Sequence, residues 1–442
     1  MSNTSMCAKH QDIVQRSRQA IANLPSVQAV GRLTVVQGMI TASLPASLGE
    51  LVEIESSLGE TSLAEVIGFD GTSVQLMPFA STQFLKRGDR VRSLGKQMRI
   101  PVGFELLGRV INSLGQPVDG KGPLNHTQTK SVVQTTPNAM TRKPIDEVFF
   151  TGQRSIDGLL TMGKGQRVGL FAGSGVGKST LLGQVAKFAS ADLNVVTLIG
   201  ERGREVLPFI KDSLGEKGMA KSVVIVSTAN ESPLARVRAA ESAVAIAHWF
   251  RQQSKDVFLM LDSLTRFSMA QRDLGLMLGE PPTSRGYTPS VFQKLADLLE
   301  QLGNTDTGSI TSLLTVLVEG DDMNDPIADA ARSILDGHII LDRKLANAGH
   351  YPPINILESV SRIFQDLATP THATNALAIR KLIAKYNDVI DLVQIGAYTK
   401  GVSAETDQAL EMYPKICDFL QQQLNEPSTV DSTLASLDVL LN

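Results

Sequence analysis

Cysteine and tryptophan are nearly absent from this sequence of 442 residues, which contains two cysteines and one tryptophan. Cys7 and Cys417 are too few for a framework of disulfides or for a cysteine-based metal site, and such scarcity is typical of a reducing compartment. Aromatic residues make up 5% of the chain and the formal net charge is −3. The sequence therefore lacks the global basic field that holds nucleic acid or anionic lipid, and we expect no nucleic-acid partner.

Long apolar segments are also missing. No uncharged apolar run approaches the ~18 residues that a membrane span needs, and the first residues lack the apolar core of a secretory signal. We therefore expect a cytoplasmic protein, which a partner must recruit if it acts at a membrane.

The first part of the chain changes pattern at about residue 26. Residues 1–25 form an N-terminal arm in which Ile13, Ile21 and Leu24 have loosely helical spacing, typical either of a surface helix or of a partner-binding helix. Residues 26–97 contain short β-rich runs separated by glycine and polar turns, which predicts a small β-barrel.

From residue 98 to 370, strands and helices are expected to alternate. Short apolar runs such as VGLFA, VVTLI and VFLMLD are typical of parallel strands buried on both faces, which predicts an α/β core. The Gly- and Pro-rich segment 101–124 within this range resembles a domain junction. Residues 371–442 are predicted to be helical, because apolar residues from Ile379 to Val393 recur on one helical face.

A glycine-rich motif, AGSGVGKS, occupies residues 172–179, between an apolar strand and a helical stretch. This is the context of a P-loop, in which glycines let backbone N–H groups converge on phosphates at a helix N-terminus. Lys178 is expected to reach the β- and γ-phosphates and the Ser179 hydroxyl to bind Mg²⁺. The predicted phosphate-binding residues are Gly173, Ser174, Gly175, Val176, Gly177, Lys178, Ser179 and Thr180.

Two carboxylates follow other apolar strands of the predicted sheet. Asp262 ends the strand VFLMLD and is either a turn former or the second Mg²⁺ ligand. Glu201 ends the run LIGE and is either a surface residue paired with Arg202 or Arg204, or the group that activates water. The P-loop favours the metal-binding interpretation of Asp262.

Two further residues remain open on spacing alone. Arg362 is either a cation that stabilises the charge of phosphoryl transfer or a structural arginine. Tyr351 either stacks on an adenine base or fills the core.

With these residues, the chain closely resembles the catalytic subunits of rotary-type hexameric ATPases, and among them the flagellar and type III secretion export ATPases. The segments that carry the resemblance are FAGSGVGKS (171–179), GERGREV (200–206), DSLTRFSMAQ (262–271), GEPPTSRGYTPS (279–290), VLVEGDDMNDPIAD (316–329), SILDGHIIL (333–341) and residues 351–362. The resemblance implies a RecA-like P-loop ATPase core with an N-terminal β-barrel and a C-terminal helical domain, assembled as a homohexamer.

The resemblance also implies roles for individual residues. Glu201 matches the catalytic glutamate, with Arg202 beside it, and Asp262 matches the metal-binding carboxylate. Arg362 matches an arginine finger that acts on the ATP of the neighbouring subunit, and Tyr351 matches the aromatic residue that stacks on adenine. The cofactor is then Mg²⁺ with ATP.

The function implied is ATP hydrolysis that energises export of flagellar proteins through a type III secretion apparatus. The implied partners are stator, regulator and central-stalk proteins, export substrates and their chaperones, and the export gate on the cytoplasmic face of the inner membrane. A virulence secretion ATPase is the first alternative, and a RecA-like nucleic-acid translocase or a nucleotide-binding subunit without turnover are less favoured ones.

Overall fold

The computed structural model describes residues 17, 28–36, 39–80, 83–125, 127–318, 320 and 322–441. The arm predicted for residues 1–25, with its partner-binding helix, lies outside the described residues except for Ser17. The chain divides into two compact units, Met1–Met98 and Arg99–Asn442.

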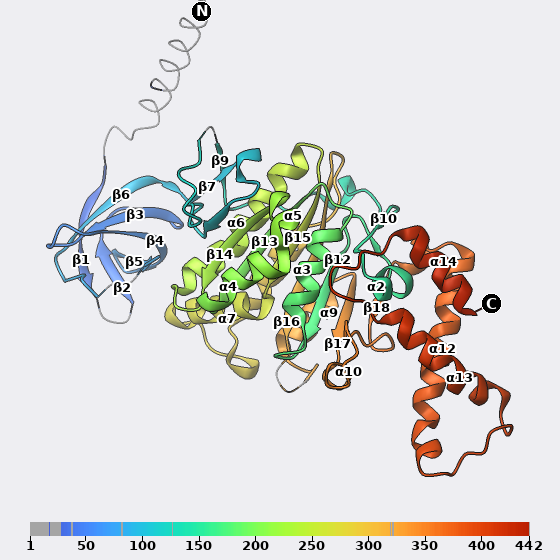
Figure 1. Ribbon diagram of the computed structural model, residues 1–442. Helices are drawn as coiled ribbons and strands as arrows, with labels where there is room; N and C mark the ends of the chain where they lie inside the picture. The colour runs from blue at the N-terminus through green and yellow to red at the C-terminus, as the bar shows by residue number, and fades with distance from the viewer. Residues whose placement is uncertain are drawn as a thin grey trace, which may run out of the picture. The chain divides into compact units, whose positions relative to one another are not determined.

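The first unit contains a closed barrel with the strand order β1-β2-β5-β4-β3-β6 (Figure 1). Its strands are β1 (Val30–Val35), β2 (Ile40–Ser43), β3 (Glu50–Glu55), β4 (Thr61–Asp70), β5 (Ser73–Pro78) and β6 (Arg90–Gln97). Along β3, Val52 and Ile54 are fully buried, whereas Glu53 and Glu55 are not. This alternation follows from the two-residue period of a strand and places the apolar side chains inside the barrel. The predicted N-terminal β-barrel is confirmed.

The second unit is built on a sheet with the order β18-β17-β12-β16-β15-β13-β14-β8. Its strands are β8 (Val110–Asn112), β12 (Arg167–Ala172), β13 (Leu193–Glu201), β14 (Ser222–Thr228), β15 (Asp256–Asp262), β16 (Ser309–Leu317), β17 (Gly337–Leu341) and β18 (Val360–Ser361). All neighbouring strands run parallel except β17 and β18. Strand β8 forms one edge of this sheet, so the segment predicted as a junction at 101–124 contributes instead to the α/β core.

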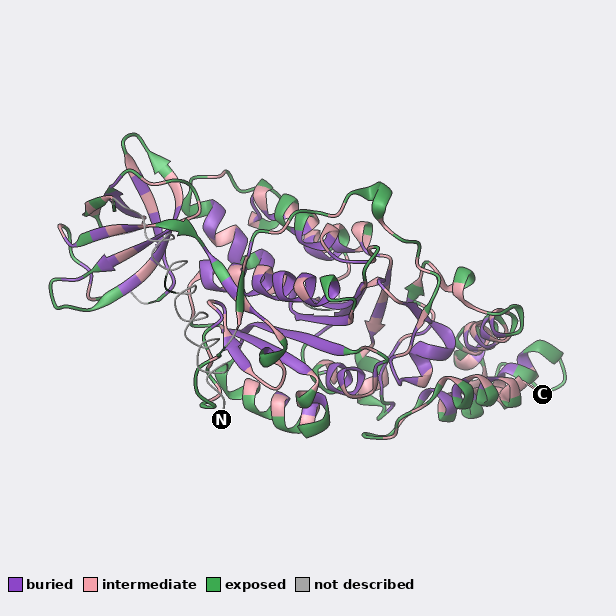
Figure 2. Cartoon of the chain, turned by 90° about the horizontal axis from the view of Figure 1, so that it is seen from above, coloured by how far each residue is buried: buried purple, intermediate pink, exposed green. Residues whose placement is uncertain are grey.

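Helices cover both faces of the sheet, which explains why a central strand such as β13 is buried along its whole length (Figure 2). On one side lies α3 (Lys178–Phe188), and on the other α6 (Pro233–Gln252) and α7 (Leu264–Met277) contact the central strands. The remaining helices of this part are α2 (Arg154–Leu159), α4 (Gly203–Pro208), α5 (Gly215–Ala220), α8 (Pro289–Glu300), α9 (Pro326–Ile334), α10 (Arg343–Asn347) and α11 (Phe364–Leu367). The α/β core expected from the alternating pattern is confirmed.

Three helices follow the sheet: α12 (Pro370–Gln394), α13 (Ala404–Leu420) and α14 (Val430–Leu441). Helices α12 and α13 pack together, and the rings of Tyr386 and Tyr413 stack with centroids 3.5 Å apart. Helix α14 contacts α12, α13 and α2. The predicted C-terminal helical part is confirmed.

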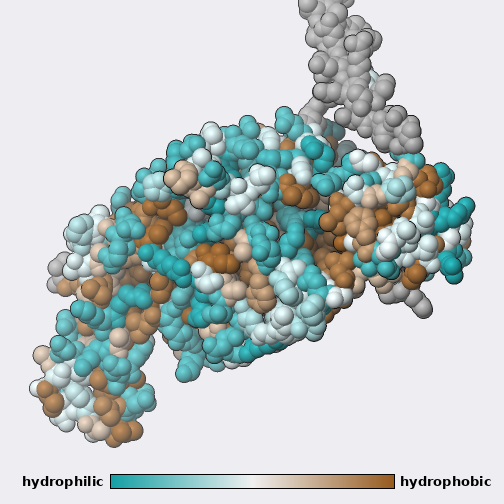
Figure 3. Space-filling view, turned by 180° about the vertical axis from the view of Figure 1, so that it is seen from behind, coloured by the Kyte–Doolittle hydropathy of each residue, from teal (hydrophilic) through white to brown (hydrophobic). Residues whose placement is uncertain are grey.

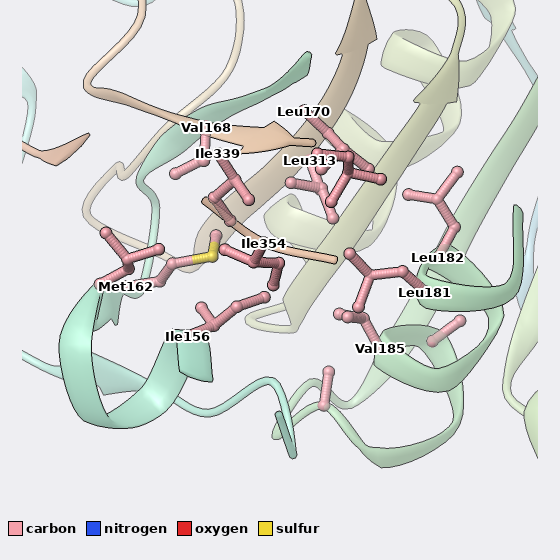
Figure 4. Close-up of a cluster of buried hydrophobic side chains, with 14 of the residues drawn as sticks. Ile156, Met162, Val168, Leu170, Leu181, Leu182, Val185, Leu313, Ile339 and Ile354 are labelled. Atoms are coloured by element: carbon pink, nitrogen blue, oxygen red, sulfur yellow. The ribbon is translucent and has the colours of Figure 1, made fainter. Parts of the chain in front are cut away.

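The main core lies between the sheet and α3, and continues toward α2 and the C-terminal helices. Figure 4 shows Val168 and Leu170 of β12 in one buried cluster with Leu181 and Val185 of α3, so that the strand and helix on either side of the glycine-rich loop are held by buried side chains. Because these side chains are closely packed, β12 and α3 are held in place, and with them the two ends of the glycine-rich loop.

Minor elements complete the second unit. They are β7 (Arg99–Val102), β9 (Gln128–Ser131), β10 (Val148–Phe149), β11 (Met162–Gly163), and the short turns η1 (Phe104–Leu106), η2 (Ala139–Thr141), η3 (Phe209–Leu214) and η4 (Ser284–Gly286). Within the described residues, no helix combines the length and apolar character needed to cross a membrane. The face seen in Figure 3 carries hydrophilic and hydrophobic side chains intermixed.

Candidate functional site: the P-loop and its neighbouring strand ends

The glycine-rich loop joins the end of β12 to the first turn of α3. Gly175 and Gly177 have φ angles of 78° and 86°, a backbone region that side-chain-bearing residues rarely adopt. Gly177 is the N-cap of α3 and no side chain caps this helix end. Its first backbone N–H groups are therefore free to bind an anion, and the helix dipole favours negative charge at the same place.

Lys178 lies across strand β16 from Asp262. Its Nζ is 2.6 Å from Oδ1 of Asp262, which also accepts a hydrogen bond from Oγ1 of Thr315 at 2.7 Å. Asp262 is 4% exposed, so this carboxylate depends on these two donors. Thr315 lies on β16, between β15, which ends in Asp262, and β12, which leads into the glycine-rich loop, and it fixes the orientation of Asp262.

Glu201 reaches the same place from the end of β13, the neighbour of β15. Its Oε1 lies 3.8 Å from Nζ of Lys178 and 3.5 Å from Nε of Arg266. This oxygen is buried and accepts no hydrogen bond from the described residues. A buried carboxylate oxygen without a hydrogen bond is costly in a merely structural role, which favours the functional alternative over a surface glutamate.

The environment of Glu201 changes its acidity. Burial raises the pKa of the Glu201 carboxyl, and the negative charge of Asp262 raises it further, whereas Lys178 and Arg266 act in the opposite direction. A carboxylate with a raised pKa is a better proton acceptor than an exposed glutamate.

The oxygen donors at this site match the requirements of Mg²⁺. The Ser179 hydroxyl at the start of α3 and the Asp262 carboxylate are hard oxygen ligands. Among the described residues, no group of three His, Cys, Asp or Glu side chains is arranged to hold a metal ion. The protein would thus supply one or two oxygens and leave the others to phosphates and water, as is usual for Mg²⁺ in nucleotide sites.

Tyr351 lies beside the loop rather than in the core. Its side chain is 48% exposed, and a Cβ placed on Gly177 would lie 3.5 Å from the Tyr351 ring. A cavity of about 640 Å³ opens at this ring. It is lined by Gln153, Gly177, Thr180, Leu181, Gln184, Gly349, Tyr351, Pro352, Pro353, Asp418, Gln421, Gln422, Gln423, Leu424 and Glu426.

The two arginines predicted to be functional, Arg202 and Arg362, lie at different places relative to the P-loop. The Arg202 side chain is 65% exposed at the start of α4 and pairs with Glu205 at 3.6 Å. Arg362 follows β18, whose Ser361 is opposite Gly337, the first residue of β17. Gly337 in turn pairs with Val168, near the start of β12, whereas the P-loop follows the end of β12. Arg362 therefore lies near the amino-terminal ends of the parallel strands, whereas Lys178 lies beyond their carboxyl-terminal ends, roughly 16 Å away along the strands.

Three features of the site were missed by sequence reasoning. Thr315 is one of four Ser or Thr residues on the buried strand β16, and Arg266 follows one turn after Asp262, so that neither stood out by spacing. Residues 421–426 line the cavity although they are more than 240 positions from the P-loop. A contact of this separation leaves no local pattern in a single sequence.

The nucleotide-binding domain model of the ATP synthase alpha/beta family matches residues 152–361, and the beta-barrel domain model of the same family matches residues 26–95. A third model, the T3SS EscN ATPase C-terminal domain, matches residues 368–438. Together with the P-loop and its carboxylates, these matches define an ATPase of the ATP synthase alpha/beta class.

Curated relatives narrow the class. The chain is 47% identical to the flagellum-specific ATP synthase of Bacillus subtilis over 94% of its own length and 96% of the relative. It is 44% identical to the type 3 secretion system ATPase of Xanthomonas euvesicatoria, over 94% of this chain and 95% of the relative. The chain belongs to the family of flagellum-specific ATP synthases and type III secretion ATPases, and the resemblance inferred from its motifs is confirmed.

A solved structure agrees with this family. The assembled ATPase EscN from the enteropathogenic E. coli type III secretion system superposes with a TM-score of 0.89 at 43% identity, covering 93% of this chain and 100% of EscN. EscN in complex with its central stalk EscO gives a TM-score of 0.87 at 42% identity, with the same coverage. The chain is accordingly an export ATPase of the flagellar or virulence type.

Proposed function

We propose that this chain hydrolyses Mg²⁺-bound ATP in a ring of identical subunits, and that hydrolysis energises export of flagellar proteins through a type III secretion apparatus. The observation that carries the proposal is the convergence of Lys178, Asp262 and Glu201 at one sheet edge beside the P-loop. The flagellar assignment is supported by the relatives from Bacillus subtilis, Treponema pallidum and Salmonella typhimurium, each a flagellum-specific ATP synthase.

In the proposed reaction, the backbone of residues 173–178 and the N-terminus of α3 bind the phosphates. Lys178 moves its charge from Asp262 toward the β- and γ-phosphates. Ser179 and Asp262 would hold Mg²⁺, whose charge would neutralise that of the phosphates. Glu201 orients the attacking water and accepts its proton at the carboxylate oxygen that has no other hydrogen-bond donor. The Tyr351 ring stacks on adenine in the adjoining cavity.

The ring follows from the position of Arg362. The Arg362 guanidinium lies near the amino-terminal ends of the strands and cannot reach phosphates bound at the P-loop of its own chain. In a head-to-tail arrangement of identical subunits, the guanidinium of one subunit can reach the phosphates bound by the next subunit. We therefore propose a homohexamer in which Arg362 acts on the ATP of the neighbour, with Arg202 beside Glu201 at the same site. The description of EscN as an assembled ATPase supports this proposal.

We further propose the partners of this ring. A central stalk is supported by the complex of EscN with its central stalk EscO. Stator and regulator proteins, chaperones and export substrates complete the set, and the ring is placed in the cytoplasm, bound peripherally to the export gate of the inner membrane.

The test combines enzymology with genetics. Purified protein is expected to release phosphate from ATP in the presence of Mg²⁺, with specific activity that rises with protein concentration. Deletion of the gene in the source bacterium is expected to abolish secretion of flagellar hook and filament proteins, with restoration by the wild type but not by Glu201→Gln. A deletion strain with normal flagella that fails to secrete virulence proteins would assign the chain to the virulence apparatus instead.

A further inference from the structure

The segment 421–426, between α13 and α14, forms one wall of the cavity beside Tyr351. We call it the strap. It contacts both sides of the nucleotide site: its Asn425 backbone N–H donates to Oε1 of Gln184 on α3, and its Gln422 backbone N–H donates to the Tyr351 carbonyl at 2.9 Å.

Gln422 is the residue through which the strap is fixed. Its Nε2 donates to the Gly152 carbonyl at 2.8 Å, and its Oε1 accepts from the Arg154 backbone N–H at 2.9 Å. The amide group thus bridges the strap to the start of α2, while the backbone of the same residue holds Tyr351. One residue therefore ties three segments that are distant in the sequence.

Arg154 reinforces this link from the side of α2. Its Nη1 lies 2.6 Å from Oε1 of Glu426, and its Nε donates to the Phe419 carbonyl at the end of α13. The Arg154 side chain is 19% exposed, so that it joins the end of α13 and the strap to a helix of the α/β core. A shift of α13 would therefore move the strap with it.

The Tyr351 side chain is about half exposed, and its position beside Gly177 depends on the course of its own backbone. The neighbouring backbone is fixed within its own loop, where the His350 N–H donates to the Leu345 carbonyl and the Pro353 carbonyl accepts from the Asp342 N–H. The carbonyl of Tyr351 is fixed by Gln422. Displacing the strap would therefore widen or close the base end of the cavity without touching the phosphate end.

We propose that Gln422 is a positioning residue for the base-binding wall: it sets the distance between the Tyr351 ring and the P-loop, and links that distance to the C-terminal helices. This inference rests on the proposed use of the cavity for the adenine base. It does not involve Gln422 in the chemical step, because Gln422 has no contact with Lys178, Glu201 or Asp262 among its hydrogen bonds.

The experiment compares Gln422→Met with Gln394→Met in the full-length protein. Methionine keeps the shape of glutamine and removes the amide, and Gln394 is an exposed glutamine at the end of α12 that does not line the cavity. For Gln422→Met we expect the KM for ATP to rise about 5- to 30-fold, with kcat changed less than about twofold. Inhibition by magnesium tripolyphosphate, which lacks a base, should stay as in the wild type, and Gln394→Met should resemble the wild type throughout.

Other results would overturn the inference. An unchanged KM, an equal loss of tripolyphosphate binding, or the same effect from Gln394→Met would each remove the positioning role of Gln422. If Gln422→Met does not fold, as judged by its thermal unfolding, Gln422→Glu serves instead. It keeps the acceptor for Arg154 but cannot donate to Gly152, and a KM for ATP equal to that of the wild type would contradict the proposal. A wild-type protein without ATPase activity would count against the proposed function and not against the strap.

Discussion

Nζ of Lys178 and Oδ1 of Asp262 are 2.6 Å apart, although the two residues stand 84 positions apart in the sequence, Lys178 at the start of α3 and Asp262 at the end of β15. The ion pair is largely shielded, since the side chains of Lys178 and Asp262 are 12% and 5% exposed. In the proposed reaction, nucleotide binding would exchange this contact for contacts of the ammonium with phosphate and of the carboxylate with Mg²⁺. The affinity of the site is therefore the difference between two sets of strong charge interactions.

Replacing Glu201 by glutamine should separate binding from chemistry. The amide keeps the size of the side chain but cannot accept a proton from water, so we expect ATP binding to persist and turnover to fall at least about 100-fold. Equilibrium binding of a fluorescent ATP analogue and steady-state phosphate release measure the two effects. Glu216→Gln, an exposed glutamate on α5, is the control, and wild-type turnover by Glu201→Gln would remove Glu201 from its role.

Mixing two inactive variants tests whether Arg362 acts on the neighbouring subunit. Arg362→Ala should lose about 10³-fold or more in kcat, the usual cost of removing an arginine finger. In an equimolar, randomly assembled mixture of Arg362→Ala with Glu201→Gln, about one interface in four should combine an intact Glu201 with an intact Arg362. Phosphate release should therefore reappear in the mixture. Mixtures that contain the double variant instead of Glu201→Gln should stay inactive, and no recovery at any ratio would contradict an inter-subunit role.

Thr315 should affect metal binding without touching nucleotide. Thr315→Val removes the hydroxyl that donates to Asp262, so the Mg²⁺ concentration for half-maximal activity should rise by roughly 10- to 100-fold. Ser312→Ala is a matched control on the same strand, because the Ser312 hydroxyl is buried and has no hydrogen-bond partner in the described structure. Equal Mg²⁺ dependence in both variants would show that Thr315 does not orient the ligand.

The acidity of Glu201 should be measurable directly. Burial and Asp262 raise the pKa of Glu201 above its ordinary value, so its carboxyl should titrate at higher pH than the exposed glutamates, as seen by carbon NMR with Glu201→Gln for assignment. Because the folded-state pKa is raised, deprotonation of Glu201 costs stability as pH rises from the unfolded toward the folded pKa. Asp262→Asn should lower the Glu201 pKa by removing a neighbouring negative charge. A Glu201 pKa that does not respond to Asp262→Asn would contradict the geometry described.

The strand, glycine-rich loop and helix around Lys178 were predictable because a local motif encodes all of their requirements. The motif fixes the phosphate cradle over eight residues, and the apolar runs of β13 and β15 predict strands whose carboxyl ends meet at that cradle. The juxtaposition of Glu201 and Asp262 with Lys178 then follows from the parallel order of the sheet. Their roles remain predictions until the variants are measured.

The strap and Thr315 could not be predicted, for a physical reason. The Gln422 amide bonds to the backbone carbonyl of Gly152 and the backbone N–H of Arg154. Because nearly all residue types offer these backbone groups, the partners of Gln422 carry no sequence signature. Thr315 resembles any other β-branched residue of a buried strand. Hydrogen bonds between distant segments depend on the packed fold rather than on neighbouring residues.

The opposite placement of Arg362 and Lys178 has a consequence for the cell. If the Arg362 guanidinium is needed for turnover, an isolated subunit cannot bring its own Arg362 to its own P-loop, and it therefore does not hydrolyse ATP. ATP would then be hydrolysed only where the local concentration of subunits is high enough for rings to form, which confines hydrolysis to the site of assembly.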